Sequence, residues 1–402
     1  MLLNSTFDSK TKPLSFLKFQ TDTIFTGTEA LSSNHVLITD TNGKIVDIVD
    51  EQSAGEDIQQ FKGIVSPGFI NCHCHLELSH LKNKIPEHTG MVDFILNVLQ
   101  KRTAPEEEIQ QAIQDAEAEM ITNGIVAVGD ICNTTDTLAQ KHKNNLYYHN
   151  FIEVSGFVPS KAKERFDEGM KVFESFNQIF PNQTSLVPHA PYSVSENLFN
   201  LIQNKSSNQI LSIHNQESEA ENELFLTKSG DFLRLYKELG IDLSHFVPTQ
   251  KSSLSSCITY LSKAAKTILA HDVFTSKTDL ELIKTYSLKS KTQFYLCLCV
   301  LANRYISDSY PDQFIFQNNL DNIVIGTDSL ASNHSLNILS EIKNINQKYP
   351  QASEFELLQC ATYNGAVALN IEHQFGSFTK GKQPGVIWIE DFKTCNKPKK
   401  LV

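Results

Sequence analysis

The segment with the clearest chemical character is Asn71-Cys72-His73-Cys74-His75, which closes a short apolar run. Residues i and i+2 of a strand point to the same side. His73 and His75 could therefore converge as imidazole ligands of zinc or a related divalent metal. The same spacing also arises where one histidine is packed and the other exposed, so it leaves both interpretations open. Cys72 and Cys74 then face the opposite way, and we interpret them as packing residues.

Four later apolar runs also end in a histidine or an aspartate. These residues are His189, His214, His271 and Asp328. If the runs are parallel strands of a barrel, their carboxyl ends share one face, where the catalytic groups of this fold class sit. With only 13 histidines in the chain, this recurrence favours a metal site over packed histidines.

The elements that would position these residues alternate along the chain. Eight short apolar runs are candidate strands: 69–75, 125–131, 146–154, 185–189, 210–214, 267–271, 293–299 and 322–328. Helix-like stretches separate nearly all of them, as at 106–121, 161–176 and 278–287. The alternation indicates a parallel sheet, and the count of eight favours a (β/α)8 TIM-type barrel over an open sheet.

Both ends of the chain show β-type sequence patterns without the alternating helices. Residues 15–50 contain short β-type runs, and Asn42-Gly43 between two of them is a strong hairpin signal. The stretch FGSFTKGKQPGVIWIE near the C-terminus returns to this pattern. We predict a small β-sandwich domain built from residues 1–63 and 374–402, beside a barrel domain of residues 64–373.

Composition limits the partners and the compartment. The 402 residues include 46 Asp and Glu against 35 Lys and Arg, and the net charge of −11 argues against a nucleic-acid polymer or an anionic membrane as partner. The first residues lack the pattern of a signal peptide, and no apolar stretch approaches the ~18 residues of a spanning helix. Eight cysteines without a CxxC pair indicate reduced thiols, so we predict a cytoplasmic protein.

Five segments taken in order resemble the motifs of the amidohydrolase superfamily. They are PGFINCHCHLELSHL, HAPYSVS, HNQESEAENELF, LAHDVF and GTDSLASNHSLNIL. The match is closer to the branch that contains cytosine, guanine, S-adenosylhomocysteine and aminofutalosine deaminases together with chlorohydrolases. The resemblance implies the barrel, the small sandwich domain and a homodimer.

The resemblance also implies roles for individual residues. The implied ligands of one divalent metal ion, zinc first and iron or manganese next, are His73, His75, His214 and Asp328. Glu217 matches the proton shuttle, and His271 matches the residue that bonds the activated water or the developing oxyanion. His189 matches a substrate contact.

Two further residues are candidate substrate contacts with a structural alternative. Glu77 could instead form an ion pair, and Asn303 could instead bond to a loop backbone. The chain departs from the family in lacking a proline after Cys299 and in carrying Gln216 before the shuttle acid. No lysine ends the fourth strand, which favours one metal over two.

The predicted chemistry gives each group a separate task. A divalent cation supplies hydroxide at neutral pH, and Asp328 accepts the proton of the water. Hydroxide attacks a ring carbon that bears an amino group, while Glu217 protonates the adjacent ring nitrogen and then the leaving ammonia. We predict a metal-dependent aminohydrolase of a small heterocycle: a purine, a pyrimidine, or an aminofutalosine- or adenosine-type nucleoside. The alternatives are a chlorohydrolase, an amide hydrolase of the same superfamily, or an inactive scaffold.

Overall fold

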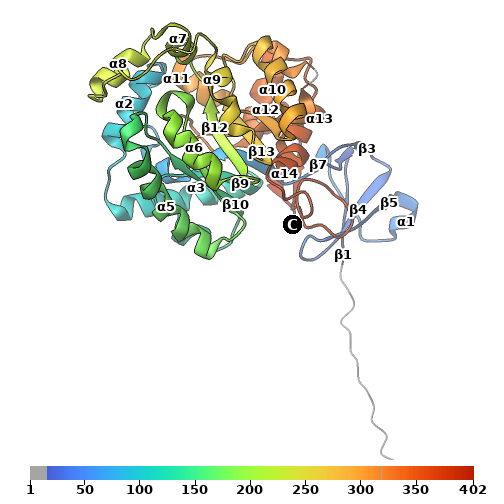
Figure 1. Ribbon diagram of the computed structural model, residues 1–402. Helices are drawn as coiled ribbons and strands as arrows, with labels where there is room; N and C mark the ends of the chain where they lie inside the picture. Colours follow the sequence, from blue (N-terminus) through green and yellow to red (C-terminus); the bar gives the residue numbers. More distant parts are fainter. Residues whose placement is uncertain (1–15, 318) are drawn as a thin grey trace, which may run out of the picture.

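Strands and helices alternate along most of the chain, as Figure 1 shows in a computed structural model that describes residues 16–317 and 319–402. All eight predicted strands are confirmed, with ends shifted by up to three residues. They are β8 (Phe69–Cys74), β9 (Ile125–Cys132), β10 (Tyr147–Val154), β11 (Thr184–Pro188), β12 (Ile210–Asn215), β13 (Lys266–His271), β14 (Gln293–Leu298) and β15 (Ile323–Ile325). The signal-peptide prediction concerns residues 1–15, which lie outside the described residues.

The eight strands form two parallel four-stranded sheets, β8 to β11 and β12 to β15, in which chain neighbours pair. Backbone hydrogen bonds join the sheets near both edges. The N–H of His214 donates to the carbonyl of His189 (2.9 Å), and the N–H of Thr327 donates to the carbonyl of His73 (3.1 Å). Because every strand runs the same way, their carboxyl ends lie on one side of the molecule.

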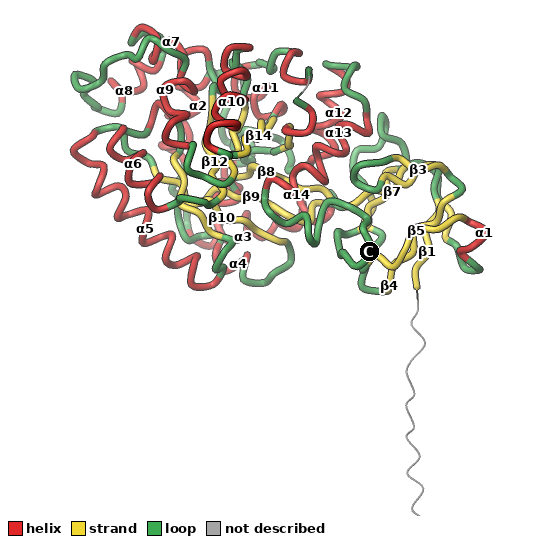
Figure 2. Tube along the Cα trace, turned by 45° about the vertical axis from the view of Figure 1, so that its right-hand side comes forward, coloured by secondary structure: helices red, strands yellow, loops and turns green. Residues whose placement is uncertain are grey.

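Helices connect the strands and cover their outer faces, as the red segments of Figure 2 show. The α-helices of this part are α2 (Met91–Lys101), α3 (Glu106–Thr122), α4 (Leu138–Lys141), α5 (Ala162–Ile179), α6 (Glu196–Lys205), α7 (Glu219–Thr227), α8 (Phe232–Glu238), α9 (Ser253–Leu261), α10 (Lys277–Ser290), α11 (Val300–Ser307), α12 (Ile338–Lys348), α13 (Glu354–Gln359) and α14 (Gly365–Ala368). Shorter helical turns are η1 (Leu76–Leu81), η2 (Pro159–Lys161), η3 (Pro191–Ser193), η4 (Gln313–Phe316), η5 (Leu320–Asn322) and the π-helical turn η6 (Cys360–Asn364). Local sequence fixes several starts: Ser276 and Asp279 form a capping box that opens α10.

The core lies between the strands and these helices. Side chains such as Phe69, Phe151 and Ile325 are completely buried. Cys72 packs toward α14, where a Cβ on Gly365 would lie 3.1 Å from the Cys72 sulfur. All eight cysteines are free, and all but the half-buried Cys395 are buried. This agrees with the predicted reduced thiols.

The chain ends form two further sheets beside the α/β part (Figure 1). One contains β1 (Phe16–Gln20), β4 (His35–Asp40), β5 (Ile45–Asp50) and β6 (Gln59–Gln60); the other contains β2 (Thr23–Phe25), β3 (Ala30–Ser32), β7 (Ile64–Pro67), β16 (Val386–Ile389) and β17 (Lys399–Lys400). A four-residue helix, α1 (Glu51–Ala54), follows β5. The predicted hairpin at Asn42-Gly43 is confirmed by the antiparallel pairing of β4 and β5.

The two end sheets share one apolar cluster. It contains Phe19 and Leu37 from one sheet and Ile24, Val65 and Val386 from the other. The pairing of β7 with both β2 and β16 links the N-terminal and C-terminal segments directly. Within the described residues, no helix has the length and apolarity needed to cross a membrane.

Candidate active site

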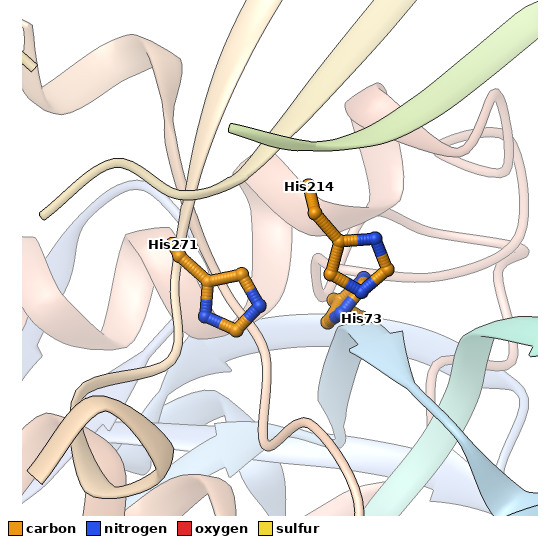
Figure 3. Close-up of side chains that lie close together, drawn as sticks. All are labelled: His73, His214 and His271. Carbon is orange, nitrogen blue, oxygen red and sulfur yellow. The ribbon is translucent and has the colours of Figure 1, made fainter. Parts of the chain in front are cut away.

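Histidines from three strands point toward one place at the carboxyl ends of the sheets. His73 of β8, His214 of β12 and His271 of β13 are shown in Figure 3. One ring nitrogen of each lies within 4.8 Å of those of the other two. His75, which directly follows β8, joins them: its Nε2 is 3.1 Å from Nε2 of His214. The convergence of these strand ends brings together residues almost 200 positions apart in the chain.

A carboxylate completes the cluster. Asp328, three residues after β15, has Oδ1 3.4 Å from Nε2 of His75 and 3.7 Å from Nε2 of His73. Its Oδ2 accepts a hydrogen bond from the hydroxyl of Ser332 at 2.5 Å. Burial would raise the pKa of Asp328, but the neighbouring His75 and His271 and the Ser332 hydrogen bond lower it overall. The carboxylate is therefore ionised at neutral pH.

The backbone turns sharply where it presents these side chains. Gln216, His271 and Asp328 have φ values of 47°, 81° and 56°, in the left-handed region that glycine normally occupies. The same holds for Asp272, with φ 54°. The surrounding hydrogen bonds hold these residues in conformations that a free chain would rarely adopt.

The donor set fits a divalent cation. Both ring nitrogens of His73 and Nε2 of His271 are buried and, within the described residues, have no hydrogen-bond partner. Buried polar atoms are otherwise almost always paired. Burial and the neighbouring histidines lower the pKa of His73, and burial lowers that of His75, so both rings are neutral and can offer a lone pair. Imidazole and carboxylate ligands of this number suit zinc, and equally iron or manganese.

One carboxylate of the site was missed by the sequence analysis. Glu153 of β10 lies 3.3 Å from Nδ1 of His214 and accepts a hydrogen bond from the side chain of Asn133. Nδ1 of His214 bonds to the carbonyl of His189 at 2.9 Å. Burial alone would lower the pKa of His214, but the neighbouring carboxylate of Glu153 raises it to about 9. The signal that could have found it is a glutamate within the apolar run 146–154.

Glu217 stands beside His271 on the same side of the cluster. Its Oε1 lies 3.4 Å from Nδ1 of His271, which also contacts Oδ1 of Asn303 at 2.8 Å. Burial raises the pKa of Glu217 to about 8 and lowers that of His271 to about 4. At neutral pH the acid is therefore protonated and can donate a proton. The imidazole is uncharged: its one N–H, on Nδ1, donates to Oδ1 of Asn303, so Nε2 has a free lone pair that can accept a hydrogen bond.

A cavity of about 180 Å³ opens onto this cluster. Its floor includes His75, His214, Glu217, His271 and Asp328, and one wall is apolar, made of Met91, Phe94, Ile95 and Val98 of α2.

The predicted substrate contacts lie at different distances from this cavity. His189 is one of the lining residues. Glu77 lies in η1, where it accepts hydrogen bonds from the backbone N–H groups of Asn133 and Thr134 and lies 3.7 Å from Arg102. Asn303 sits behind His271. Neither Glu77 nor Asn303 lines the cavity, so contact of either with substrate stays a prediction.

Comparison with known proteins identifies the family. The model of the amidohydrolase family matches residues 64–401, which is most of the chain. The chain belongs to the amidohydrolase family. It is therefore a hydrolase acting on carbon–nitrogen bonds and dependent on a metal, as the donor set of the site also indicates.

Relatives of this amidohydrolase include named deaminases. The chain is 29% identical to an adenosine deaminase of Helicobacter pylori over 82% of this chain and 81% of that protein. It is 25% identical to a 5-methylthioadenosine/S-adenosylhomocysteine deaminase of Teredinibacter turnerae over 81% of this chain and 72% of that protein. The fold matches the crystal structure of H. pylori aminofutalosine deaminase in complex with methylthio-coformycin, with a TM-score of 0.78, 22% identity, and 96% and 100% of the two chains covered.

Proposed function

We propose that this amidohydrolase catalyses the hydrolytic deamination of an adenine-type nucleoside, with release of ammonia. The observation that carries the proposal is the position of Glu217, a protonated acid beside His271, at the edge of a His/Asp cluster that opens onto one cavity. The names of the relatives support an adenosine-like substrate. No contact in the site favours a chloro-heterocycle or an amide instead.

One divalent cation is part of the proposal, and zinc is the expected metal. His73, His75, His214 and Asp328 would hold it. When bound, such a cation supplies Lewis acidity that lowers the pKa of water from 15.7 toward about 7. Asp328, which is ionised, would take the proton released from the attacking water.

The remaining chemistry belongs to the side chains around the cluster. With its pKa raised to about 8, Glu217 carries a proton at pH 7 and would donate it to the ring nitrogen next to the reacting carbon. The same carboxylate, now ionised, would then take the proton of the hydroxyl group added to the ring carbon and pass it to the amino group, which leaves as ammonia. His271, whose Nδ1–H donates to Asn303, would accept a hydrogen bond from the attacking water at its free Nε2 and so orient that water. His189 would contact the substrate from the wall of the cavity.

The finer architecture is proposed on the same basis. The backbone hydrogen bonds between His189 and His214 and between His73 and Thr327 support closure of the eight strands into a barrel. The apolar cluster shared by the end sheets supports a small β-sandwich domain. We propose the division at residues 63 and 374, with β7 as the link between the two parts. A homodimer and a cytoplasmic location remain predictions.

The experiment is an assay of ammonia release from adenine-type nucleosides and free bases, with metal content measured on the same samples. His73→Ala should lose the metal and ammonia release together. His373→Ala removes an exposed histidine and serves as the matched control. Ammonia release that survives metal loss would contradict the proposal. Faster chloride release from a 6-chloropurine nucleoside than ammonia release from its amino counterpart would favour the chlorohydrolase alternative.

A further inference from the structure

A lysine is completely buried behind the carboxyl ends of β8 and β9. Lys141, the last residue of α4, has no exposed surface. Its ammonium group lies 2.5 Å from Oδ2 of Asp130, 2.9 Å from Oδ1 of Asn150 and 3.1 Å from the sulfur of Cys132. An ammonium has three donors, and three acceptors surround it here. The group is thus fully paired without contact to the cavity.

The second oxygen of Asp130 reaches the metal-site segment. Asp130 is also completely buried, and its Oδ1 accepts a hydrogen bond from the backbone N–H of Leu76 at 2.8 Å. Leu76 lies between His75, at the cluster, and Glu77, in η1. One carboxylate therefore connects the buried ammonium to the peptide group between His75 and Leu76.

The segment after β9 also anchors the start of η1, through a second residue. Oε2 of Glu77 accepts hydrogen bonds from the backbone N–H groups of Asn133 and Thr134, three and four residues after Asp130. With Leu76 and Glu77 both tied to this segment, the path of the chain out of β8 is fixed. The direction of the His75 ring follows from that path.

We propose that Asp130 and Lys141 form a buried positioning pair, which orients His75 by anchoring the N–H of Leu76. The lysine holds the carboxylate of Asp130 in place, so that the acceptor for this N–H stays in position. Neither residue lines the cavity that opens onto the cluster. Hydrogen-bonded groups behind metal ligands typically change metal affinity or activity 10–100-fold when removed.

The test compares two variants that both lack the ion pair. The double variant D130N/K141M keeps an oxygen that can accept from Leu76, whereas D130L/K141M has a side chain of similar size without an acceptor. The first readout is the dissociation constant for Zn²⁺ alone, measured in chelator-buffered titrations. We expect it to be about 10–100-fold higher for D130L/K141M than for D130N/K141M. The second readout is deaminase activity, and it rests on the proposed function. We expect kcat/KM of D130L/K141M to be lower than that of D130N/K141M by a similar factor. The loss should lie mainly in kcat, because neither substitution changes a residue that lines the cavity.

Two controls separate positioning from general damage. Cys132→Ala removes another contact of Lys141 without touching Leu76, and both readouts should stay within about twofold of the wild type. If D130L/K141M does not fold, as judged by circular dichroism, D130A/K141M replaces it. Equal zinc affinities for the acceptor-keeping and acceptor-lacking variants would overturn the proposal. The zinc titration gives this answer even if no tested nucleoside is deaminated.

Discussion

Binding of zinc should displace a proton from His214, and Glu153 determines how tightly that proton is held. With a pKa of about 9, His214 is protonated at neutral pH in the metal-free protein. A metal ligand must be deprotonated, so the cation competes with this proton. The other histidines contribute little, because burial lowers the pKa of His73 and of His75. The ionised Asp328 has no proton to lose.

The size of the effect follows from the pKa. At pH 7, a ligand with a pKa of about 9 weakens apparent metal affinity roughly 100-fold, and the penalty grows about tenfold for each further unit of acidification. Between pH 8 and pH 6 the dissociation constant for zinc should therefore rise about 90-fold through His214 alone. In Glu153→Gln the charge that retains the proton is gone. If His214 returns to its ordinary value near 6.5, the rise over the same interval falls to about fourfold.

The assay is titration calorimetry with Zn²⁺ at pH 7 in buffers of different ionisation enthalpy, which counts the protons released. Glu153→Gln should release roughly three quarters of a proton fewer than the wild type, because a ring with a pKa near 6.5 is still about one quarter protonated at pH 7. Ionisation of a bound water contributes equally to both proteins and cancels in the difference. Glu281→Gln, a change of an exposed carboxylate, is the control. Equal proton counts and equal pH slopes in the wild type and Glu153→Gln would refute the reasoning.

Three further outcomes are expected. Glu217→Gln should lower kcat by about 10²–10⁴ with unchanged zinc content, because only the proton donor is lost; a metal-free variant would contradict this role. Asn303→Leu should lower kcat about 10–100-fold and leave KM nearly unchanged, since His271 loses its partner but the cavity keeps its lining; steady-state kinetics would reveal a KM effect instead. Phe69→Ala should reduce the free energy of unfolding by about 3–5 kcal/mol in denaturant titrations, whereas Phe16→Ala at a 44% exposed position should change it far less.

The sequence predicted the strands well because buried parallel strands leave an unambiguous pattern. Runs such as 125–131 and 210–214 are short, continuous and apolar, and helical periodicity separates them. The last strand was predicted to be longer than it is. β15 ends at Ile325, because the chain then turns through Gly326 toward the left-handed conformation of Asp328. A backbone change of this kind leaves no hydrophobic signal.

Residues at the strand ends could be selected from the sequence, but their partners could not. Glu153 belongs to the site only because β10 places it against His214, 61 positions later. Lys141 belongs to the polar stretch Lys141-His142-Lys143, which is typical of a solvent-exposed surface. The side chain of Lys141 is nevertheless completely buried. Pairing across the sheet decides both cases. Composition and periodicity contain no information about such pairing.

The left-handed backbone conformations of Gln216, His271 and Asp328 lower the stability of the folded protein. Each such residue costs of order 1–3 kcal/mol relative to a relaxed backbone. Glycine at position 271 or 328 would relieve that cost while deleting the side chain. Selection for thermal stability alone would therefore favour glycine at these positions, and the resulting proteins would lose activity. Stability and catalytic activity thus place opposite demands on these two residues.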